Sequence, residues 1–282
     1  MVRPTVAIVG AGRLGTALGL GLARAKWTVS MVRRTGRSAR RATRLGLSLA
    51  TDRQLGRVDL CVIAVPDHTV AAASAEIAPR LGASAALVHC AGALGLRAFG
   101  IGPALRRPRG SFHPLCAVSS PSDSLSGYAV AISATDDHLL EGLKKMAAAL
   151  QMLPIAIPEK KRRAYHAGAM ISAGGIVALA SASVAAFQAA GIDESRALAA
   201  LLPLMRSALT GIEKRGLAAA LTGPIARGDE DTVAGHLAAL PANLVDLYRD
   251  LALRSLHLAR KRLSAKRRKR LEEILRAVTR SR

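Results

Sequence analysis

Aromatic residues make up only 2% of the 282-residue chain, so it has few side chains from which to build the base-stacking platforms of single-strand-binding proteins. Cysteine is also scarce: Cys61, Cys90 and Cys116 are odd in number and have no metal-like spacing. These absences argue against a disulfide framework and favour a reducing, cytoplasmic setting. No cluster of His, Cys, Asp or Glu has zinc-like spacing, and no nucleophile triad is indicated.

Acidic residues are few: the chain has 19 Asp and Glu but 41 Lys and Arg, which gives a formal net charge of +22. Such an excess suggests an anionic partner such as nucleic acid or a membrane surface. The cations gather at residues 33–44 and 260–270, with Arg276, Arg280 and Arg282 after the second cluster. The second cluster is expected to lie on a terminal helix, in which regularly spaced leucines mark an apolar face and the cations face solvent. A nucleic-acid role for these cations is the alternative.

Charged residues are absent from residues 167–190, a stretch long enough to span a bilayer. The stretch is rich in Ala, Gly and Ser rather than Leu and Ile, which favours a helix buried between domains or subunits over a membrane span. We expect no signal peptide, because the first predicted strand begins at Thr5.

Three closely spaced glycines follow that first strand. Residues 5–9 read as a buried strand, residues 14–25 as a helix and residues 27–32 as the next strand, which together make a βαβ unit. The turn between the first strand and the helix contains Gly10, Gly12 and Gly15, the spacing of a dinucleotide-binding turn. The backbone amides around Arg13 and Leu14 would open the helix and favour a diphosphate.

The end of the second strand predicts which dinucleotide binds. An NAD site places an Asp or Glu there for the ribose hydroxyls, but the first acidic residue of this chain is Asp52. Arg33 and Arg34 can instead donate charge-assisted hydrogen bonds to a 2′-phosphate, and Thr35 adds a hydroxyl. The sequence therefore predicts NADP(H) rather than NAD(H). We expect most of the other arginines up to Arg44 to be the solvated face of the following helix.

Two further apolar runs, residues 59–65 and 85–90, read as buried parallel strands. Ligands of doubly wound sheets sit outside the carboxyl ends of such strands. We therefore expect Ala64, Val65 and Pro66 after the first run, and Ala91 and Gly92 after the second, to line the nicotinamide half of the crevice. Asp67 and His68, which come next to Pro66, are expected to start a helix rather than to act in catalysis.

Strand signals stop near residue 158. Residues 128–133 and 154–157 read as the last strands, with a helix over residues 137–150 between them. Helices are then expected over residues 162–190, 194–213, 216–221, 229–240 and 242 to the C-terminus, with breaks at Gly191, Gly223–Pro224 and Pro241. The expected architecture is an α/β, doubly wound domain over residues 1–157 followed by an all-α domain over residues 158–282.

Several separated motifs also suggest a family. They lie at residues 10–15, 33–35, 64–67, 89–92, 112–115, 165–167 and 221–228, the last two reading Tyr-His-Ala and Leu-Thr-Gly-Pro-Ile-Ala-Arg-Gly. On these motifs the chain resembles the Rossmann-like proteins that carry a helical C-terminal domain of unknown function, within the superfamily of 6-phosphogluconate and β-hydroxyacid dehydrogenases. The resemblance implies an NADP-dependent reductase of a small-molecule substrate, with a cleft between two domains and a homodimer formed through the C-terminal helices.

Some relatives resemble an alternative type of ketopantoate reductase, and others are similar to pyrroline-carboxylate reductases. In the family the Tyr-His helix usually continues to a Ser-Asn pair, whereas this chain has Ala173–Gly174. In related ketoacid reductases an Asn on that helix binds the substrate oxygen. This departure motivates a competing hypothesis of another class, a non-catalytic NADP-binding sensor or partner module.

Because hydride transfer belongs to the nicotinamide, the protein has to orient it and supply a proton. His166, at the start of the first helix of the second domain, is the candidate general acid, and a helix-start histidine bonded to the backbone is the alternative. Lys161, or Lys160 beside it, could polarise a carbonyl or bind a carboxylate. His113, a further catalytic candidate, ends a strand on the cleft side, where Ser111 and the backbone could help to seat an anionic substrate. The alternative for His113 is a residue that only fixes the turn before Pro114.

Overall fold

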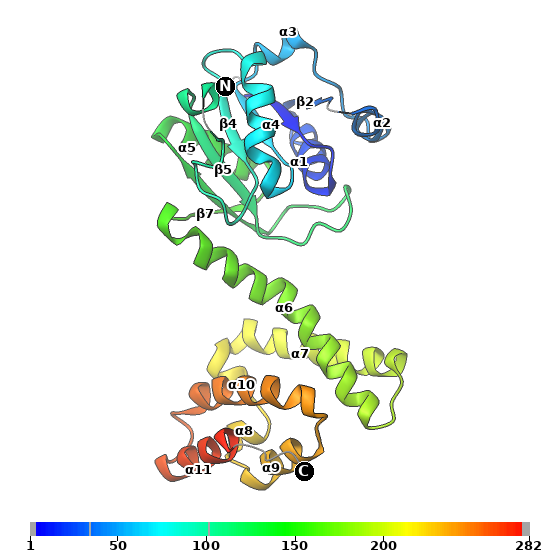
Figure 1. Cartoon of the computed structure of the whole chain (residues 1–282), viewed down its shortest axis with the longest axis vertical. Coiled ribbons are helices and arrows are strands. Elements are labelled where there is room, and N and C mark those ends of the chain that lie inside the picture. Colours follow the sequence, from blue (N-terminus) through cyan, green and yellow to red (C-terminus); the bar gives the residue numbers. More distant parts are fainter. Residues whose placement is uncertain (1–3, 34, 101, 278–282) are drawn as a thin grey trace. The chain divides into compact units, whose positions relative to one another are not determined.

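The computed structural model describes residues 4–33, 35–100 and 102–277 (Figure 1). The chain divides into two compact units, Met1–Ala173 and Gly174–Arg282. The change from strands to helices comes earlier than this division, after the last strand ends at Ala156. The boundary at residue 158 therefore stays a prediction.

A seven-stranded sheet forms the centre of the first unit. Its strands lie in the order β2-β1-β3-β4-β5-β6-β7. The first five are parallel, β6 is antiparallel to β5, and β7 is parallel to β6. Their bounds are Thr5–Val9 (β1), Thr28–Val32 (β2), Leu60–Ile63 (β3), Ala86–His89 (β4), Arg109–Pro114 (β5), Ala129–Ala134 (β6) and Leu153–Ala156 (β7).

The direction of winding reverses beside β1. From β1 the chain moves outward to β2 and then crosses back to place β3 on the other side of β1. This is a topological switch point, outside which doubly wound sheets bind their ligands. The turn after β1 and the segment after β3 therefore meet at the expected position of a dinucleotide.

Both faces of the sheet are buried. Alternation along β1 sends Val6 and Ile8 into one core and Ala7 and Val9 into the other. Helices α1 and α5 contribute to the first core, and α4 contributes to the second. The helices of this unit are α1 (Arg13–Arg24), α2 (Gly36–Arg44), α3 (Asp52–Leu55), α4 (Val70–Ile77) and α5 (Asp137–Ala149). The predicted doubly wound α/β fold is confirmed.

The C-terminal part is helical, as expected. Helix α6 (Arg162–Ala189) spans the division between the units, and α7 (Glu194–Ala220), α8 (Pro224–Arg227), α9 (Glu230–Ala239), α10 (Ala242–Ala259) and α11 (Ala265–Arg276) follow it. One expectation was wrong: the helix from residue 242 does not run on to the C-terminus. It ends at Ala259, and Ser264 caps α11 by accepting a hydrogen bond from the backbone N–H of Arg267.

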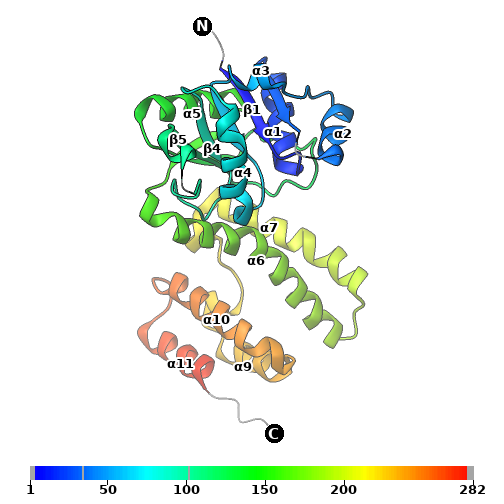
Figure 2. The ribbon, with the colours of Figure 1, turned by 45° about the horizontal axis from the view of Figure 1, so that its top comes forward.

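This break folds α11 back onto α10. The two helices pack side by side (Figure 2). Leu271 and Leu275 of α11 are buried in one cluster with Leu256 of α10. A single straight helix would have left these leucines in solvent, so burial of the apolar face explains why the chain turns here.

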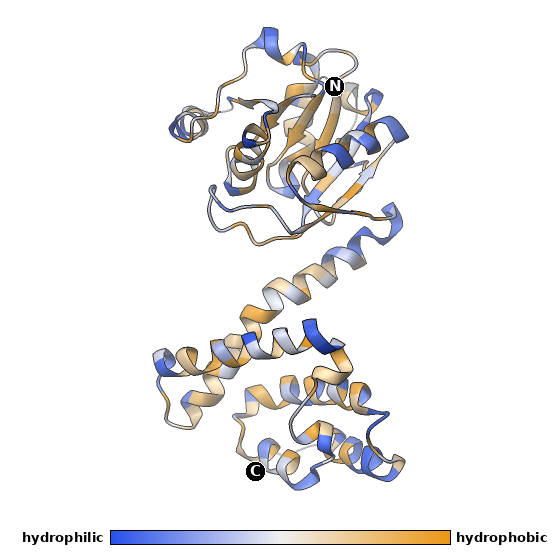
Figure 3. Cartoon of the chain, turned by 180° about the vertical axis from the view of Figure 1, so that it is seen from behind, coloured by the Kyte–Doolittle hydropathy of each residue, from blue (hydrophilic) through white to orange (hydrophobic). Residues whose placement is uncertain are grey.

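Large apolar side chains remain exposed on α6 and α7. Figure 3 colours the ribbon by hydropathy and shows hydrophobic stretches along both helices. Val177 is 70% exposed, Leu204 is 64% exposed and Leu217 is 61% exposed. Within the described part of the chain, one segment, Glu159–Ala189, is long and apolar enough to cross a membrane by length and composition. Only 6% of its most apolar window is buried within this single chain.

Candidate cofactor and active site

The glycine turn after β1 has the geometry that the sequence predicts. Gly10 has φ of +110°, and a Cβ atom there would collide with the carbonyl oxygen of Ala64. A Cβ atom on Gly15 would collide with the carbonyl oxygen of Gly10. These two glycines are therefore required by the packing of β1, α1 and the segment after β3.

Gly12 differs from its two neighbours. A Cβ atom on Gly12 would meet no protein atom within 4 Å, so nothing within the described structure requires a glycine there. Gly12 also precedes α1, whose first turn carries no acid and no side-chain cap. An open space before an uncapped helix N-terminus is what a pyrophosphate needs, because the free N–H groups and the helix dipole both favour an anion. The residues present therefore fit a dinucleotide.

The second predicted cofactor segment follows β2. Arg33 is exposed at the end of that strand, and Arg34 lies outside the described residues. Thr35 caps α2: its hydroxyl oxygen accepts from the backbone N–H of Ser38 at 3.1 Å, and the Ser38 hydroxyl accepts from the backbone N–H of Thr35 at 3.0 Å. The Thr35 hydroxyl thus already has a structural role, and contact with a 2′-phosphate stays a prediction for Arg33, Arg34 and Thr35.

The arginines of α2 are exposed, as the sequence predicts. They share one side of the helix, because their spacing follows its turn. They line a hollow of about 380 Å³ together with a proline from the loop before β6, and its lining consists of Arg37, Arg40, Arg41, Arg44, Leu45 and Pro121. The sequence indicated only a solvated face, since it gives no sign that residue 121 comes close.

The nicotinamide side of the predicted site is a cavity of about 360 Å³. It brings together the glycine turn, the ends of β4 and β5, and the first turns of α6. Its lining consists of Arg13, Leu14, Asp67, Cys90, Gly92, His113, Pro114, Cys116, Val118 and His166. Five predicted site residues, Arg13, Leu14, Gly92, His113 and His166, therefore meet in one place. Ala64, Val65, Pro66 and Ala91 follow β3 and β4 as expected but are not among the lining residues.

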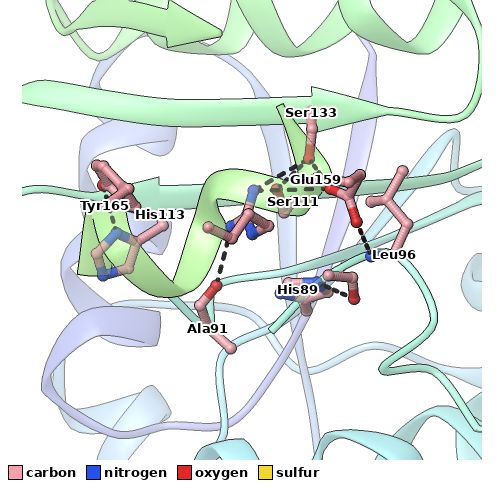
Figure 4. Close-up of polar contacts among 10 residues, drawn as sticks. His89, Ala91, Leu96, Ser111, His113, Ser133, Glu159 and Tyr165 are labelled. Atoms are coloured by element: carbon pink, nitrogen blue, oxygen red, sulfur yellow. Dashed lines mark hydrogen bonds and ion pairs between the residues drawn. The ribbon is translucent and has the colours of Figure 1, made fainter. Parts of the chain in front are cut away.

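A hydrogen-bonded pair adjoins this cavity. The Tyr165 hydroxyl lies 2.8 Å from Nδ1 of His113 (Figure 4). The rings of His113 and His166 meet edge to face, with centroids 5.8 Å apart. Tyr165 belongs to the Tyr-His-Ala motif, but the sequence did not predict that it lies at the site. The feature of the sequence that could have identified Tyr165 as a site residue is its position immediately before His166.

Burial sets the protonation of this pair. It lowers the pKa of His113 to about 4, and the nearby charges of His166 and Arg162 act in the same direction. It raises the pKa of Tyr165 to about 12, against the opposing effect of Arg162. At neutral pH His113 is therefore uncharged and Tyr165 holds its proton. With the His113 proton on Nε2, Tyr165 donates to Nδ1 and the imidazole keeps its one N–H, on Nε2, to donate.

Gly92 makes room for both histidines. A Cβ atom there would lie 2.7 Å from Nε2 of His113 and would collide with Cδ2 of His166. The two imidazoles therefore pack directly over the backbone of the segment after β4. A glycine at this position is a steric requirement of the histidine pair.

A buried arginine anchors the start of α6. Arg162 is 1% exposed, and it donates to the hydroxyl of Ser133 at 3.1 Å and to the carbonyl oxygen of Ala91 at 3.2 Å. Glu159 accepts from the same hydroxyl at 3.0 Å and from the backbone N–H of Leu96 at 2.7 Å (Figure 4). Burial lowers the pKa of Arg162, and the charge of Glu159 opposes this effect.

The neighbouring lysines lie elsewhere. Lys160 and Lys161 are exposed and are not among the residues that line the cavity. The catalytic role of Lys161 stays a prediction, and the cation that faces the sheet is Arg162. Across residues 4–33, 35–100 and 102–277, no group of three or more His, Cys, Asp or Glu could hold a metal ion.

Comparison with known families supports this two-part organisation. Residues 1–101 match a Rossmann-like domain, and residues 128–255 match a domain of unknown function, DUF2520. No curated protein matches the sequence.

Similar solved structures cover nearly the whole chain. Protein TM1727 from Thermotoga maritima is 25% identical, with 92% of this chain and 99% of that chain covered and a TM-score of 0.72. A proposed NADP oxidoreductase from Bacteroides fragilis, BF3122, is 23% identical, with 90% and 98% covered and a TM-score of 0.70. Pyrroline carboxylate reductase from Plasmodium falciparum, solved with NADP bound, is 13% identical, with 96% and 99% covered and a TM-score of 0.62.

Proposed function

Because the chain joins a Rossmann-like domain to a DUF2520 domain, we propose that it is an NADP(H)-dependent oxidoreductase. We propose that it reduces a small carbonyl compound, with a 2-oxo acid such as ketopantoate as the first candidate. The observation that carries this proposal is the cavity that joins the glycine turn to His113 and His166. A site that only bound a dinucleotide would have no need of histidines beside the nicotinamide position.

The residues that would hold the cofactor follow from the geometry. Gly12 and the backbone N–H groups of Arg13 and Leu14 would face the pyrophosphate. Arg33 would meet the 2′-phosphate, since no carboxylate precedes Asp52 to repel it. When bound, the nicotinamide supplies the hydride. The proposal of NADP(H) is supported by the similarity to the proposed NADP oxidoreductase from Bacteroides fragilis and to the Plasmodium falciparum reductase solved with NADP bound.

The chain's own part is to hold a proton beside the substrate oxygen. His166 lines the cavity directly and is the proposed general acid. His113 and Tyr165 form a second hydrogen-bonded donor next to it. Because His113 is uncharged at neutral pH, its role is to donate a hydrogen bond and orient the substrate rather than to attract an anion.

An imine substrate is the alternative within the same chemistry. The similarity to a pyrroline carboxylate reductase supports it, because reduction of a cyclic imine needs the same hydride and proton. A non-catalytic NADP-binding sensor or partner module is the alternative of another class. The Ala173–Gly174 pair, where the resembled family has Ser-Asn, motivates that alternative.

We further propose a homodimer formed through the C-terminal helices, located in the cytoplasm. The exposed apolar side chains of α6 and α7 support the dimer, because such a surface is unfavourable in water. Light scattering after gel filtration tests it. A monomer at micromolar concentration would contradict this part of the proposal.

The experiment that tests the reductase measures NADPH oxidation with ketopantoate, other 2-oxo acids and cyclic imines, beside NADH. We expect oxidation of NADPH by one substrate class, and a loss of about 100-fold or more in kcat for His166→Ala with NADPH binding retained. His138→Ala, an exposed histidine of α5, is the matched control and should keep full activity. Tight NADPH binding with no substrate-dependent oxidation across the panel would contradict the reductase and support the binding module.

A further inference from the structure

The end of α10 and the start of α11 carry a concentration of positive charge that the proposed reductase does not use. Eight of the eleven residues 260–270 are Lys or Arg, and no acid occurs between Asp250 and Glu272. This segment also lies beyond residues 128–255, which match the domain of unknown function.

Several of these cations lie at the N-terminus of α11, where positive charge is unfavourable. The first turn of α11 contains no acid and carries Lys266, Arg267 and Arg268. A helix N-terminus is the positive end of the helix dipole, so cations there are unfavourable, and they also repel one another. A bound anion would reverse the sign of both effects.

The fold neutralises only some of this charge. Arg270 lies 3.6 Å from Glu230 and 3.6 Å from Glu273, and Arg262 donates to the carbonyl oxygens of Leu221 and Ala218. In the described part of the chain, Lys261, Lys266 and Lys269 are exposed and form no ion pair. Their charges therefore have no structural role in this unit.

The two helices also enclose a basic hollow of about 450 Å³. Glu272 is the only acid of its lining, and Arg276 neutralises it at 2.8 Å. Arg268 lines the hollow, and its Nε atom is buried without a hydrogen-bond partner. An acceptor oxygen of a ligand would satisfy that donor. The full lining is Leu253, Leu256, His257, Arg260, Ala265, Arg268, Lys269, Glu272 and Arg276.

The form of the surface indicates the kind of anion. The twelve residues of α11 extend over about 18 Å, which is longer than one phosphate group can contact. The apolar face of α11, with Leu271 and Leu275, is buried against α10, so this helix has no apolar face to insert into a bilayer. Residues 251–277 contain no aromatic side chain on which a base could stack.

We infer that the surface formed by Arg260, Lys261, Lys266, Arg267, Arg268 and Lys269 binds the phosphodiester backbone of a nucleic acid without reading its bases. We call these six residues the α10–α11 basic surface. A nucleic-acid role for this cluster of cations was the alternative interpretation of the sequence. The buried leucines agree with the expected terminal helix, so the inference rests on Lys261, Lys266 and Lys269, which are exposed and form no ion pair in the described part of the chain. The inference goes beyond the proposed reductase and does not depend on it.

The test uses the full-length protein and two duplex DNAs of unrelated sequence, with binding followed by fluorescence anisotropy from 50 to 200 mM salt. We expect equal affinity for both duplexes and a steep fall with salt, since each phosphate contact contributes about 0.9 to the slope of log K against log salt. Lys261→Gln, Lys266→Gln and Lys269→Gln together should weaken binding by about tenfold or more at 100 mM salt and lower that slope by about 2–3.

The charge-matched control combines Arg53→Gln, Arg57→Gln and Lys145→Gln, three exposed cations of the first unit. This control should bind as the wild type does, and saturating NADPH should not displace the duplex. No binding at 50 mM salt, an equal loss in both triple variants, or displacement by NADPH would overturn the inference. Binding to anionic vesicles or to inorganic phosphate, with no binding to DNA or RNA duplexes, would also overturn it.

Discussion

The guanidinium of Arg162 donates a hydrogen bond of 3.2 Å to the carbonyl oxygen of Ala91, which ties the first turn of α6 to the end of β4. Gly92, the next residue, packs under His113 and His166. His166 itself lies one helical turn after Arg162. One buried side chain therefore positions two segments of the candidate active site, although it does not line the cavity.

Replacing Arg162 with Met should lower the free energy of unfolding by about 2–4 kcal/mol, because it removes two hydrogen bonds and leaves the carbonyl of Ala91 and the carboxylate of Glu159 without this partner. Urea denaturation measures the change. Arg163→Met is the matched control, because Arg163 is the next residue and is exposed. An equal, small effect of both variants would contradict the anchoring role.

Two glycines of the turn after β1 should respond differently to the same substitution. Gly15→Ala should destabilise the fold, because its Cβ atom would collide with the carbonyl oxygen of Gly10. Gly12→Ala should unfold at nearly the wild-type temperature, because its Cβ atom meets no protein atom within 4 Å. It should nevertheless weaken NADPH binding by about tenfold or more, since the methyl group would fill the pyrophosphate space. NADPH binding at wild-type strength in Gly12→Ala would show that the dinucleotide lies elsewhere.

The elements that make this turn could be predicted from the sequence. The strands β1, β3 and β4 are mainly apolar and are interrupted only by Thr5 at the start of β1 and His89 at the end of β4, and the glycine spacing leaves few conformations open. The antiparallel direction of β6 could not be predicted, because a short run such as residues 129–134 has the same alternation in either direction.

Charged segments were the least predictable part of the site. Residues 160–163 are four consecutive cations, and although the helix start at residue 162 was predicted, the sequence does not show which of the four turns inward. Because the helix starts at Arg162, that arginine faces the sheet while Lys161 stays in solvent. The break between α10 and α11 was missed for a related reason: the apolar period continues through it, and only Ser264 marks the new helix.

Gly92→Ala should impair catalysis by displacing both histidines. Its Cβ atom would lie 2.7 Å from Nε2 of His113 and would collide with His166. We expect kcat for the substrate found in the NADPH assay to fall by about 100-fold, with a smaller change in NADPH affinity. Gly142→Ala in α5 is the control, because nothing lies within 4 Å of its added Cβ, and it should be neutral or slightly stabilising. Full activity in Gly92→Ala would exclude the histidine pair from the reaction.

The choice of NADP(H) over NAD(H) should depend on Arg33. Arg33→Glu should weaken NADPH binding by about tenfold or more and affect NADH much less, because the new carboxylate would repel a 2′-phosphate and could accept hydrogen bonds from ribose hydroxyls. Titration of both cofactors measures the ratio of the two Kd values. Arg53→Glu, which makes the same charge change at an exposed position of α3, should leave that ratio unchanged. A constant ratio in Arg33→Glu would assign the preference to other residues.

Acid should destabilise the fold through His89. This side chain is fully buried, and burial lowers its pKa to about 4, with the charge of Arg162 as the second cause. Unfolding restores the ordinary value near 6.5, so the unfolded chain binds the extra proton between pH 6.5 and 4. Stability is therefore fully present above pH 6.5 and is lost as the pH falls to 4, by about 3 kcal/mol for this group.

The measurement is urea denaturation at pH 7 and at pH 4.5 for the wild type, His89→Gln and His138→Gln. The first variant removes the buried titrating group, so its stability should fall less between the two pH values than that of the wild type. The second removes an exposed histidine and should follow the wild type. Because the carboxylates titrate alike in all three proteins, the difference in pH dependence isolates His89. If His89→Gln lost as much stability as the wild type over this interval, the buried imidazole would have to be charged in the folded protein.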